Sequence, residues 1–495
     1  MIFNSLTYLV FLAAFCLLYW TLPRPARLLL ILGSSLVFYG FWRVEYIPVM
    51  LASVTVDYVL ARKINGAAGA RRRGLLVLSL FTNLGLLAYF KYTIFIVDNL
   101  SSLAGLLGGD GIAPPDILLP LGISFYTFQS ISYTVDVYRG HARPERSFVL
   151  FAGYVTFFPQ LVAGPILRAN EVIWQLDKRP AFNLEDIAAG VRRILCGLFL
   201  KVVLADNVAA YVDDAFALAP HTLSAYDVGT MCLLFGFQIY FDFSAYSHIA
   251  IGSARLMGIR FPENFNFPYS AVSPRQFWQR WHISLSSWIR DYLYLPLRGL
   301  PVRDSSEGGV PVGDAKGGES ARRTGALFAT WALMGLWHGA AWTFVLWGVW
   351  HAVLVLGYRL IAPAARKLRL PSALGWCATF PLIMLGWLPF RAGSIEETAR
   401  LAANFSQAAK YYDPLPVGSY LLSAFPRNLN PDSYVIAAVL CLMVLVAPVV
   451  KDLYERLAAA SASSRFAMET MTVVATALLV FIYLRPIRQF IYFQF

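Results

Sequence analysis

Residues 74–90 read GLLVLSLFTNLGLLAYF and contain no charged side chain. Runs of the same kind are TYLVFLAAFCLLYW (7–20), LLLILGSSLVFYGFW (28–42), YVIAAVLCLMVLVAPVV (434–450) and VVATALLVFIYL (473–484). Each approaches the roughly 20 apolar residues that a helix needs to cross the hydrocarbon core of a bilayer. The sequence therefore predicts an all-α integral membrane protein, a multi-pass helical bundle with about nine to twelve crossings, re-entrant and interfacial helices included.

The composition of the whole chain supports this class. Of its 495 residues, 58% are hydrophobic and only 14% are charged, whereas a soluble domain carries roughly 25% charged residues. We expect a single membrane domain over residues 1–495. The five cysteines stand singly in apolar runs without a C-x-x-C pair, so we interpret them as packing residues and expect neither disulfides nor a metal site.

The net charge of +12 is explained by membrane topology. The basic stretches RPAR (24–27) and ARKINGAAGARRR (61–73) lie two predicted crossings apart, hence on one face of the membrane. Basic loops favour the cytoplasmic side, so we predict a periplasmic N-terminus and no nucleic-acid partner. The first 23 residues contain no Lys or Arg, which favours a retained helix over a cleavable signal.

Glycine and proline interrupt two further apolar stretches, LPLGISFYTFQS (119–130) and FFPQLVAGPILR (157–168). Backbone freed by these residues is tolerated at membrane depth only where protein or a water-filled cavity covers it. We predict re-entrant walls of a cavity, with ordinary helix ends as the alternative. The segment 300–323 is rich in Gly and Ser with mixed charge, and we expect a flexible cytoplasmic loop.

The segment SPRQFWQRWHISLSSWIRDYLYLPLRG (273–299) predicts a helix that begins with a Ser273 cap and Pro274. At about 100° per residue it carries two stripes. The apolar stripe is Trp278, Trp281, Leu285, Trp288 and Tyr292, and the polar one is Arg275, Gln279, His282, Ser286 and Arg290. An aromatic stripe beside a cationic one is typical of a helix that lies in the membrane interface, in contact with lipid.

A histidine stands inside the apolar stretch ALMGLWHGAAWTFVLWGVWHA (332–352). An ionisable group in the membrane is costly and indicates a functional site, although an interhelical hydrogen bond would also satisfy a neutral imidazole. The small residues 339–341 that follow His338 leave room for a ligand or a second backbone. His351 is 351 − 338 = 13 positions on, about 220° around a continuous helix, which favours a packing role.

A neutral imidazole in a dry cavity suits one kind of chemistry in particular. It is a general base for a hydroxyl that attacks an activated acyl group, because its pKa lies near operating pH and burial favours its neutral form. Excluding water protects a thioester from hydrolysis. The chain contains no G-x-S-x-G motif, and this chemistry does not require a nucleophilic Ser or Cys.

Several motifs resemble the membrane-bound O-acyltransferase (MBOAT) family, and within it the bacterial alginate O-acetyltransferase-like branch. They are LPLGISFYTFQSISYTVDVYRG (119–140), FFPQLVAGPI (157–166), FDFSAYSHIAIGSARLMGI (241–259), PENFNFPYSAVSPRQFWQRWHISLSSWIRDYLYLPL (262–297), MGLWHGAAWTFVLWGVWHA (334–352), WLPFRA (387–392) and FIYFQF (490–495). They span nearly the whole chain in the expected order, and the WHISLS and WHG pair is highly specific.

The resemblance implies a helical bundle around a central funnel or tunnel in the bacterial inner membrane. It implies that His338, the histidine of W-H-G, is catalytic, and that His282 is the second signature position. It further implies a cytoplasmic acyl donor, acetyl-CoA, and no bound cofactor. The acyl group passes to an exported polysaccharide through a separate periplasmic acetyltransferase partner. On this basis His338 is the general base and His282 orients the substrate or donor.

Two positions depart from the branch pattern: His248 stands where Asp is expected, and Arg298 where Gly is usual. Arginines near the predicted cytoplasmic side would attract the anionic donor. The weaker candidates for substrate or donor binding are Arg275, Arg290, Arg298, Asp242 and His248.

The sequence leaves several alternatives open. Alginate or an alginate-like exopolysaccharide is the favoured acceptor, with cellulose or peptidoglycan acetylated by the same mechanism as alternatives. A transporter or flippase of an acylated carrier would also use broken helices and midplane polar groups. A haem protein would use His282 and His338 as axial ligands.

Overall fold

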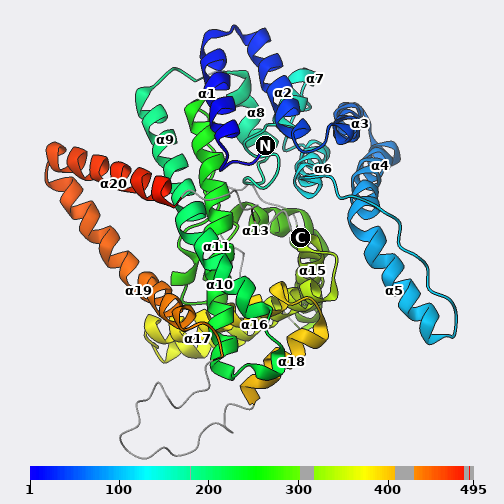
Figure 1. Cartoon of the computed structure of the whole chain (residues 1–495). Coiled ribbons are helices and arrows are strands. Elements are labelled where there is room, and N and C mark those ends of the chain that lie inside the picture. Colours follow the sequence, from blue (N-terminus) through cyan, green and yellow to red (C-terminus); the bar gives the residue numbers. More distant parts are fainter. Residues whose placement is uncertain (179, 301–316, 407–427, 484–489, 491–495) are drawn as a thin grey trace, which may run out of the picture. The chain divides into compact units, whose positions relative to one another are not determined.

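The computed structural model describes residues 1–178, 180–300, 317–406, 428–483 and 490 (Figure 1). Every regular element within these residues is helical, which confirms the all-α prediction. Six helical stretches there are long and apolar enough to cross a membrane: Val44–Asn65, Gly69–Leu106, Ala225–Leu256, Trp342–Lys367, Ser372–Arg391 and Arg465–Ile482. Leu6–Thr21 and Pro431–Ala447 are shorter apolar helices. The chain is therefore a multi-pass membrane protein, with fewer long apolar helices among the described residues than the expected nine to twelve crossings.

The chain forms two compact units. Unit 1 comprises Met1–Gly197 and Tyr246–Glu263. Its helices before the second of these segments are α1 (Leu6–Thr21), α2 (Arg24–Gly40), η1 (Val44–Tyr46), α3 (Ile47–Asn65), α4 (Gly69–Leu87), η2 (Ala88–Tyr92), α5 (Thr93–Leu106), α6 (Ile123–Arg139), α7 (Phe148–Val155), α8 (Ala169–Asp177) and α9 (Leu184–Leu198).

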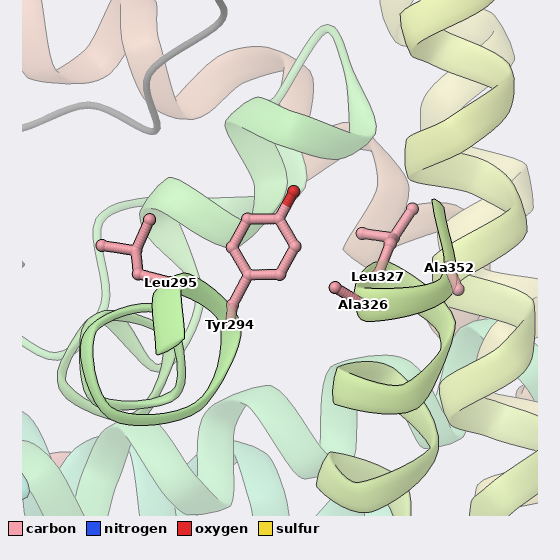
Figure 2. Close-up of a cluster of buried hydrophobic side chains, with 5 residues drawn as sticks. All are labelled: Tyr294, Leu295, Ala326, Leu327 and Ala352. Carbon is pink, nitrogen blue, oxygen red and sulfur yellow. The ribbon is translucent and has the colours of Figure 1, made fainter. Parts of the chain in front are cut away.

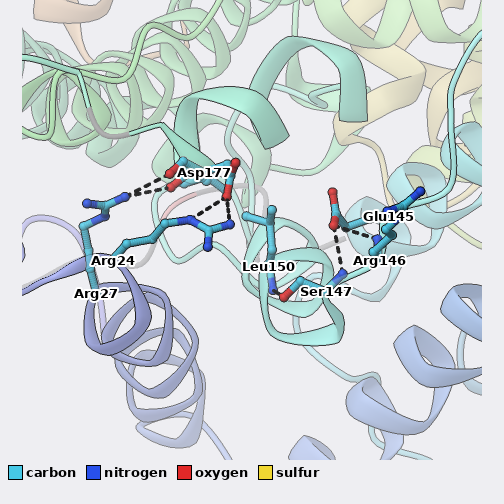
Figure 3. Close-up of polar contacts among 8 residues, drawn as sticks. Arg24, Arg27, Glu145, Arg146, Ser147, Leu150 and Asp177 are labelled. Atoms are coloured by element: carbon cyan, nitrogen blue, oxygen red, sulfur yellow. Dashed lines mark hydrogen bonds and ion pairs between the residues drawn. The ribbon is translucent and has the colours of Figure 1, made fainter.

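Polar side chains at the ends of helices join and cap several helices of unit 1. Figure 3 shows Arg24 and Arg27 of α2 reaching Asp177 at the end of α8: Arg24 pairs with its carboxylate, and Arg27 donates to its main-chain carbonyl (3.1 Å). The Ser147 hydroxyl caps α7 by accepting from the main-chain N–H of Leu150 (3.2 Å). The stretch 24–27, expected as a loop, therefore forms the first turn of α2, and the expected loop 61–73 narrows to residues 66–68 between α3 and α4.

The Gly/Pro-rich stretch 157–168 is irregular backbone, and residues 157–167 are buried. A Cβ on Gly122, which has φ +72°, would overlap the carbonyl oxygen of Leu161, so glycine lets the start of α6 approach this segment closely. Protein thus covers the broken backbone, as its sequence requires. A cavity wall at this place stays a prediction.

Unit 2 comprises Leu198–Ala245 and Asn264–Ile491. Its elements are η3 (Phe199–Ala205), α10 (Asp206–Phe216), η4 (Pro220–Thr222), the first part of α11 (Ala225–Leu256), η5 (Pro268–Ser270), α12 (Pro274–Arg280), α13 (Ile283–Ile289), η6 (Arg290–Tyr294), α14 (Leu295–Leu297), α15 (Gly317–His338), α16 (Trp342–Lys367), α17 (Ser372–Arg391), α18 (Ile395–Ser406), α19 (Pro431–Ala460) and α20 (Ala462–Ile482).

The predicted helix over 273–299 begins as expected but does not continue. Ser273 caps α12 by accepting from the main-chain N–H of Gln276 (3.2 Å). The helix then breaks at Trp281 and His282, and residues 290–294 form a π-helical turn. The apolar stripe does not face a lipid interface, because Trp278, Trp281 and Trp288 are buried in unit 2. The prediction of one continuous polar stripe is also wrong, because His282 lies at the break between α12 and α13 and is fully buried.

The predicted loop 300–323 falls partly outside the described residues, which resume at Gly317. Residues 317–323 begin α15. A small apolar cluster anchors this helix next to the 290–297 segment: Tyr294 and Leu295 meet Ala326, Leu327 and Ala352 (Figure 2). The cluster therefore ties α15 and α16 to the region that follows His282.

The apolar stretch 332–352 is two helices, with a break at residues 339–341. The alternative of one continuous helix over residues 332–352 is therefore wrong. Glycines set the close packing of α15 on α16: a Cβ on Gly335 would overlap the Phe344 carbonyl oxygen, and one on Gly348 would overlap that of Trp331. Small residues at such crossings let two helix backbones approach closely, and this approach positions the end of α15.

The Gly348→Ala variant is expected to lower the free energy of unfolding by about 1–3 kcal/mol, because the added methyl group forces the two backbones apart. Gly357 lies in the same helix with open space around it. Gly357→Ala is the matched control and should stabilise the protein slightly, by about 0.5–1 kcal/mol, through better helix propensity. Denaturant titration of the purified protein in micelles measures both; equal effects of the two variants would contradict close packing at Gly348.

Candidate active site

His282 stands at the junction of α12 and α13 in a left-handed backbone conformation, with φ +42°. A second segment holds this junction. The main-chain N–H of Ile283 donates to the carbonyl of Asn264 (2.9 Å), and the main-chain N–H of Asn266 donates to that of Arg280 (2.9 Å). Strained backbone of this kind persists only where the surroundings determine it, and it concentrates at functional sites.

Two truncations of His282 should separate backbone strain from side-chain loss. Both His282→Gly and His282→Ala remove the imidazole, but only glycine adopts positive φ without steric cost. We expect the glycine variant to be more stable than the alanine variant by about 1–2 kcal/mol, the reverse of their order in a helix. Thermal and denaturant unfolding in detergent measure the difference, and an alanine variant that is equally stable would argue against strain at this position.

The His282 ring is fully buried. Its Nδ1 lies 3.1 Å from Oδ1 of Asn264, and the Phe243 ring meets it edge-on at 4.6 Å between centroids. Burial lowers the pKa of His282 to about 3, since removing an imidazolium from water penalises the charged form. The ring is therefore neutral at neutral pH.

His338 is the last residue of α15, and its side chain is buried. Its ring contacts Trp337 and Trp347, each at 4.9 Å between centroids, and Phe390 at 5.5 Å. The room expected beside Gly339 is taken by Phe344, whose ring a Cβ at that position would overlap. The imidazole thus lies in an aromatic surround built from the end of α15, from α16 and from α17.

The two signature histidines converge on one indole. The ring of Trp337 lies 4.9 Å from that of His338 and 6.4 Å from that of His282. The residues come from separate segments of the sequence, and the tertiary structure of unit 2 brings them to the same side chain. The sequence indicated both histidines but not Trp337, although this tryptophan stands directly before His338 in the W-H-G motif.

His351 is buried in packed aromatic surroundings, in agreement with a packing role. The indole Nε1 of Trp278 donates to its Nδ1 (3.3 Å). Its ring also lies 4.9 Å from that of Trp347, which contacts His338 as well. The break between α15 and α16, rather than a shared helix face, places both histidines around this tryptophan.

Asp242 is in a buried ion pair. Its Oδ1 lies 2.5 Å from Nζ of Lys201, which is also 2.8 Å from the carboxylate of Asp206. Lys201 belongs to the π-helical segment η3, and its ammonium lies over the ring of Phe490 at 4.6 Å. The sequence interpretation missed Lys201, although a lysine within the apolar run LFLKVVLA (198–205) is the same signal that singled out Asp242.

The three candidate arginines all lie in unit 2 and are half-buried. Arg290 pairs with the neighbouring carboxylate of Asp291 (2.6 Å), so its charge is partly neutralised. The guanidinium of Arg298 lies over the ring of Tyr294 at 5.7 Å. Arg275 lies in the first turn of α12. Their role in donor binding stays a prediction, as does that of His248, a half-buried residue of unit 1.

Comparison with known proteins decides the family. A profile described as "MBOAT, membrane-bound O-acyltransferase family" matches residues 141–309, which include His282. The chain is 41% identical over 412 residues to "Probable alginate O-acetylase AlgI" of Azotobacter vinelandii, covering 82% of this chain and 78% of that protein. The chain belongs to the MBOAT family.

Two more relatives support the assignment. The chain is 40% identical over 406 residues to the protein of the same name from Pseudomonas aeruginosa, covering 81% of this chain and 74% of that one. It is 36% identical over 408 residues to "Peptidoglycan O-acetyltransferase" of Helicobacter pylori, covering 77% and 73%. The predicted resemblance to the alginate O-acetyltransferase-like branch is confirmed, and the protein is an O-acyltransferase. The transporter and haem-protein interpretations are therefore set aside.

Proposed function

We propose that this MBOAT protein passes an acetyl group from cytoplasmic acetyl-CoA across the bacterial inner membrane for O-acetylation of an exported polysaccharide. Support comes from the names of its relatives, "Probable alginate O-acetylase AlgI" and "Peptidoglycan O-acetyltransferase". The higher identity to the alginate proteins favours alginate or an alginate-like exopolysaccharide as the acceptor. Peptidoglycan or cellulose is the alternative.

The observation that carries the mechanism is the convergence of His282 and His338 on Trp337. Both imidazoles are buried. In our proposal, His338 is the general base and removes the proton of an acceptor hydroxyl as its oxygen attacks the thioester carbonyl. The acyl–sulfur bond breaks, an acyl–oxygen ester forms, and the proton passes from the imidazole to the departing thiolate. The buried aromatic surround limits competing hydrolysis by water.

The proposal also includes topology and partners. The N-terminus is periplasmic, in keeping with the basic residues of 24–27 and 61–73 on the cytoplasmic side. The acyl donor enters from the cytoplasm through a funnel that leads to His338, and Arg275, Arg290 and Arg298 attract its phosphates. A separate periplasmic acetyltransferase receives the acyl group and delivers it to the polymer. Membrane lipid surrounds the apolar helices.

Deletion of the gene, followed by acetyl-ester analysis of each surface polymer, tests the acceptor. We expect ester loss from one exopolysaccharide and unchanged acetylation of peptidoglycan and cellulose. Loss confined to peptidoglycan would reassign the acceptor. Labelled acetyl-CoA offered to purified protein with its partner tests the donor, and failure to release free CoA would contradict the proposed reaction.

A further inference from the structure

The side chain of Asn264 makes three polar contacts through one atom. Its Oδ1 lies 3.1 Å from Nδ1 of His282, 2.9 Å from the hydroxyl of Ser284 and 3.3 Å from the main-chain N–H of Ser284. The side chain of Asn264 is fully buried. A buried polar group with partners of this kind has little freedom to reorient.

The chemistry of these contacts fixes which end of the amide faces the histidine. A main-chain N–H is only a donor, so the atom that faces Ser284 must be the amide oxygen and not the NH₂ group. The amide oxygen is only an acceptor. The nitrogen of His282 that faces the same oxygen must therefore donate, and its proton lies on Nδ1.

A neutral imidazole with its proton on Nδ1 carries its lone pair on Nε2. Burial keeps the ring neutral, because the pKa of His282 falls to about 3. Through Nε2, such a ring accepts a hydrogen bond or a proton and donates neither. It can accept a hydrogen bond from a hydroxyl group, but it cannot donate one to the carbonyl oxygen of a thioester.

His351 provides a contrast within the same unit. The indole of Trp278 is only a donor and faces Nδ1 of His351 at 3.3 Å, so that nitrogen is the acceptor and a neutral His351 carries its proton on Nε2. Two buried histidines of unit 2 thus have opposite tautomers, each set by a neighbouring side chain. Burial alone does not choose between tautomers, whereas a specific partner does.

We propose that Asn264 is a positioning residue that holds His282 in the Nδ1–H tautomer, so that His282 engages the acyl acceptor through Nε2, as a hydrogen-bond acceptor toward a donor group other than the hydroxyl whose proton His338 removes. The second half of this proposal rests on the proposed acyl transfer to a hydroxyl. The first half concerns the folded protein alone. The strained backbone at His282 and the main-chain hydrogen bonds between 264–266 and 280–283 hold the side chains of Asn264 and His282 next to each other.

Magnetic resonance of the full-length protein in bilayers, with ¹⁵N- and ¹³C-labelled histidine, tests the tautomer without any substrate. The signals of His282 and His351 are assigned by difference against His282→Gln and His351→Gln. We expect a protonated Nδ1 and an unprotonated Nε2 for His282, and the opposite for His351. A protonated Nε2 in His282 of the wild-type protein would overturn the proposal whatever the variants do.

Three variants then link the tautomer to the reaction. Asn264→Leu removes the acceptor and should shift His282 toward Nε2–H, with acetyl transfer reduced at least tenfold. Asn264→Asp supplies a carboxylate oxygen in the same place and should retain the Nδ1–H tautomer and more of the activity than the leucine variant. Ser284→Ala is the matched control, since it removes a hydroxyl contact of Asn264 but leaves the bond to the histidine, and it should retain the tautomer.

The outcomes separate this proposal from the proposed function. If transfer rates across the variants do not follow the fraction of Nδ1–H tautomer, His282 does not act through Nε2 and the second half is wrong. If Asn264→Leu does not fold, the proposal is still tested by the wild-type spectrum and by the tautomers of the Ser284→Ala and Asn264→Asp variants. If the tautomer is as expected but the wild-type protein transfers no acetyl group, the proposed function is wrong and the positioning by Asn264 stands.

Discussion

Replacing His338 with glutamine is expected to lower the rate of acetyl transfer by about 10²–10⁴-fold, the usual contribution of a positioned general base. Glutamine is close in size to histidine and fits among Trp337, Trp347 and Phe390 without a large cavity. It has no basic nitrogen at neutral pH, so it cannot take the hydroxyl proton. Release of labelled CoA by the purified protein with its partner measures the loss, and normal polymer acetylation with His338→Gln inserted at wild-type levels would refute the base assignment.

His351→Gln is the matched control for this experiment. His351 is also a buried histidine of unit 2 and also contacts Trp347, but it lies in packed aromatic surroundings that we interpret as structural. The change weakens the hydrogen bond from Trp278, which should cost about 1 kcal/mol of stability. We expect acetyl transfer within a few-fold of the wild-type rate, so a loss as large as that of His338→Gln would indicate that transfer depends on the packing around Trp347 rather than on a base.

Removing one partner of the Lys201–Asp242 ion pair is expected to have the largest effect on stability. Both side chains are almost completely buried, with 2% and 4% exposed. Lys201→Met leaves the carboxylate of Asp242 buried without its cation, and an uncompensated buried charge costs about 3–5 kcal/mol. Denaturant titration in micelles measures the loss, and expression level in the membrane should fall with it.

The double variant Lys201→Met, Asp242→Leu identifies the cause. It removes both members of the pair and replaces them with apolar side chains, which is often neutral for a buried ion pair. We expect it to recover most of the stability lost by the single variant. Asp452→Asn, which breaks the exposed pair with Arg456, should have no measurable effect. A double variant as unstable as Lys201→Met would show that the charge of Asp242 is not responsible, and would place the loss on the lysine stem or on Asp206, which also pairs with Lys201.

Helical structure was predictable from the sequence because long apolar runs leave few alternatives in a membrane. The runs 7–20 and 74–90 lie on helices as expected. Helix continuity was less predictable. The 273–299 and 332–352 segments both have helical periodicity, yet each helix is interrupted beside a signature histidine. Main-chain hydrogen bonds with the segment 264–266 stabilise the first break, at Trp281 and His282. No pattern in the sequence around the break indicates such a partner.

The candidate site was predictable only in part, for the same reason. Histidines in apolar sequence are rare enough to stand out, so His282 and His338 were found. Their surroundings were not, because Trp337, Asn264 and Lys201 resemble ordinary membrane-protein residues until folding places them. Asn264 in particular lies in a polar stretch, PENFN (262–266), where an asparagine does not by itself indicate a functional site. Its significance depends on which atom of which residue it faces.

The indole of Trp337 touches two imidazoles that lie 338 − 282 = 56 positions apart in the chain. This arrangement has a consequence for biosynthesis. Helices enter a bilayer one after another as the ribosome makes them, and the second histidine emerges well after the first. A nascent or misassembled chain therefore lacks the pair of histidines around Trp337. Under the proposed function, it can transfer an acyl group only after the later helices have packed. Under the proposed function, unfinished copies of the protein would leave the cellular pool of activated acetate untouched.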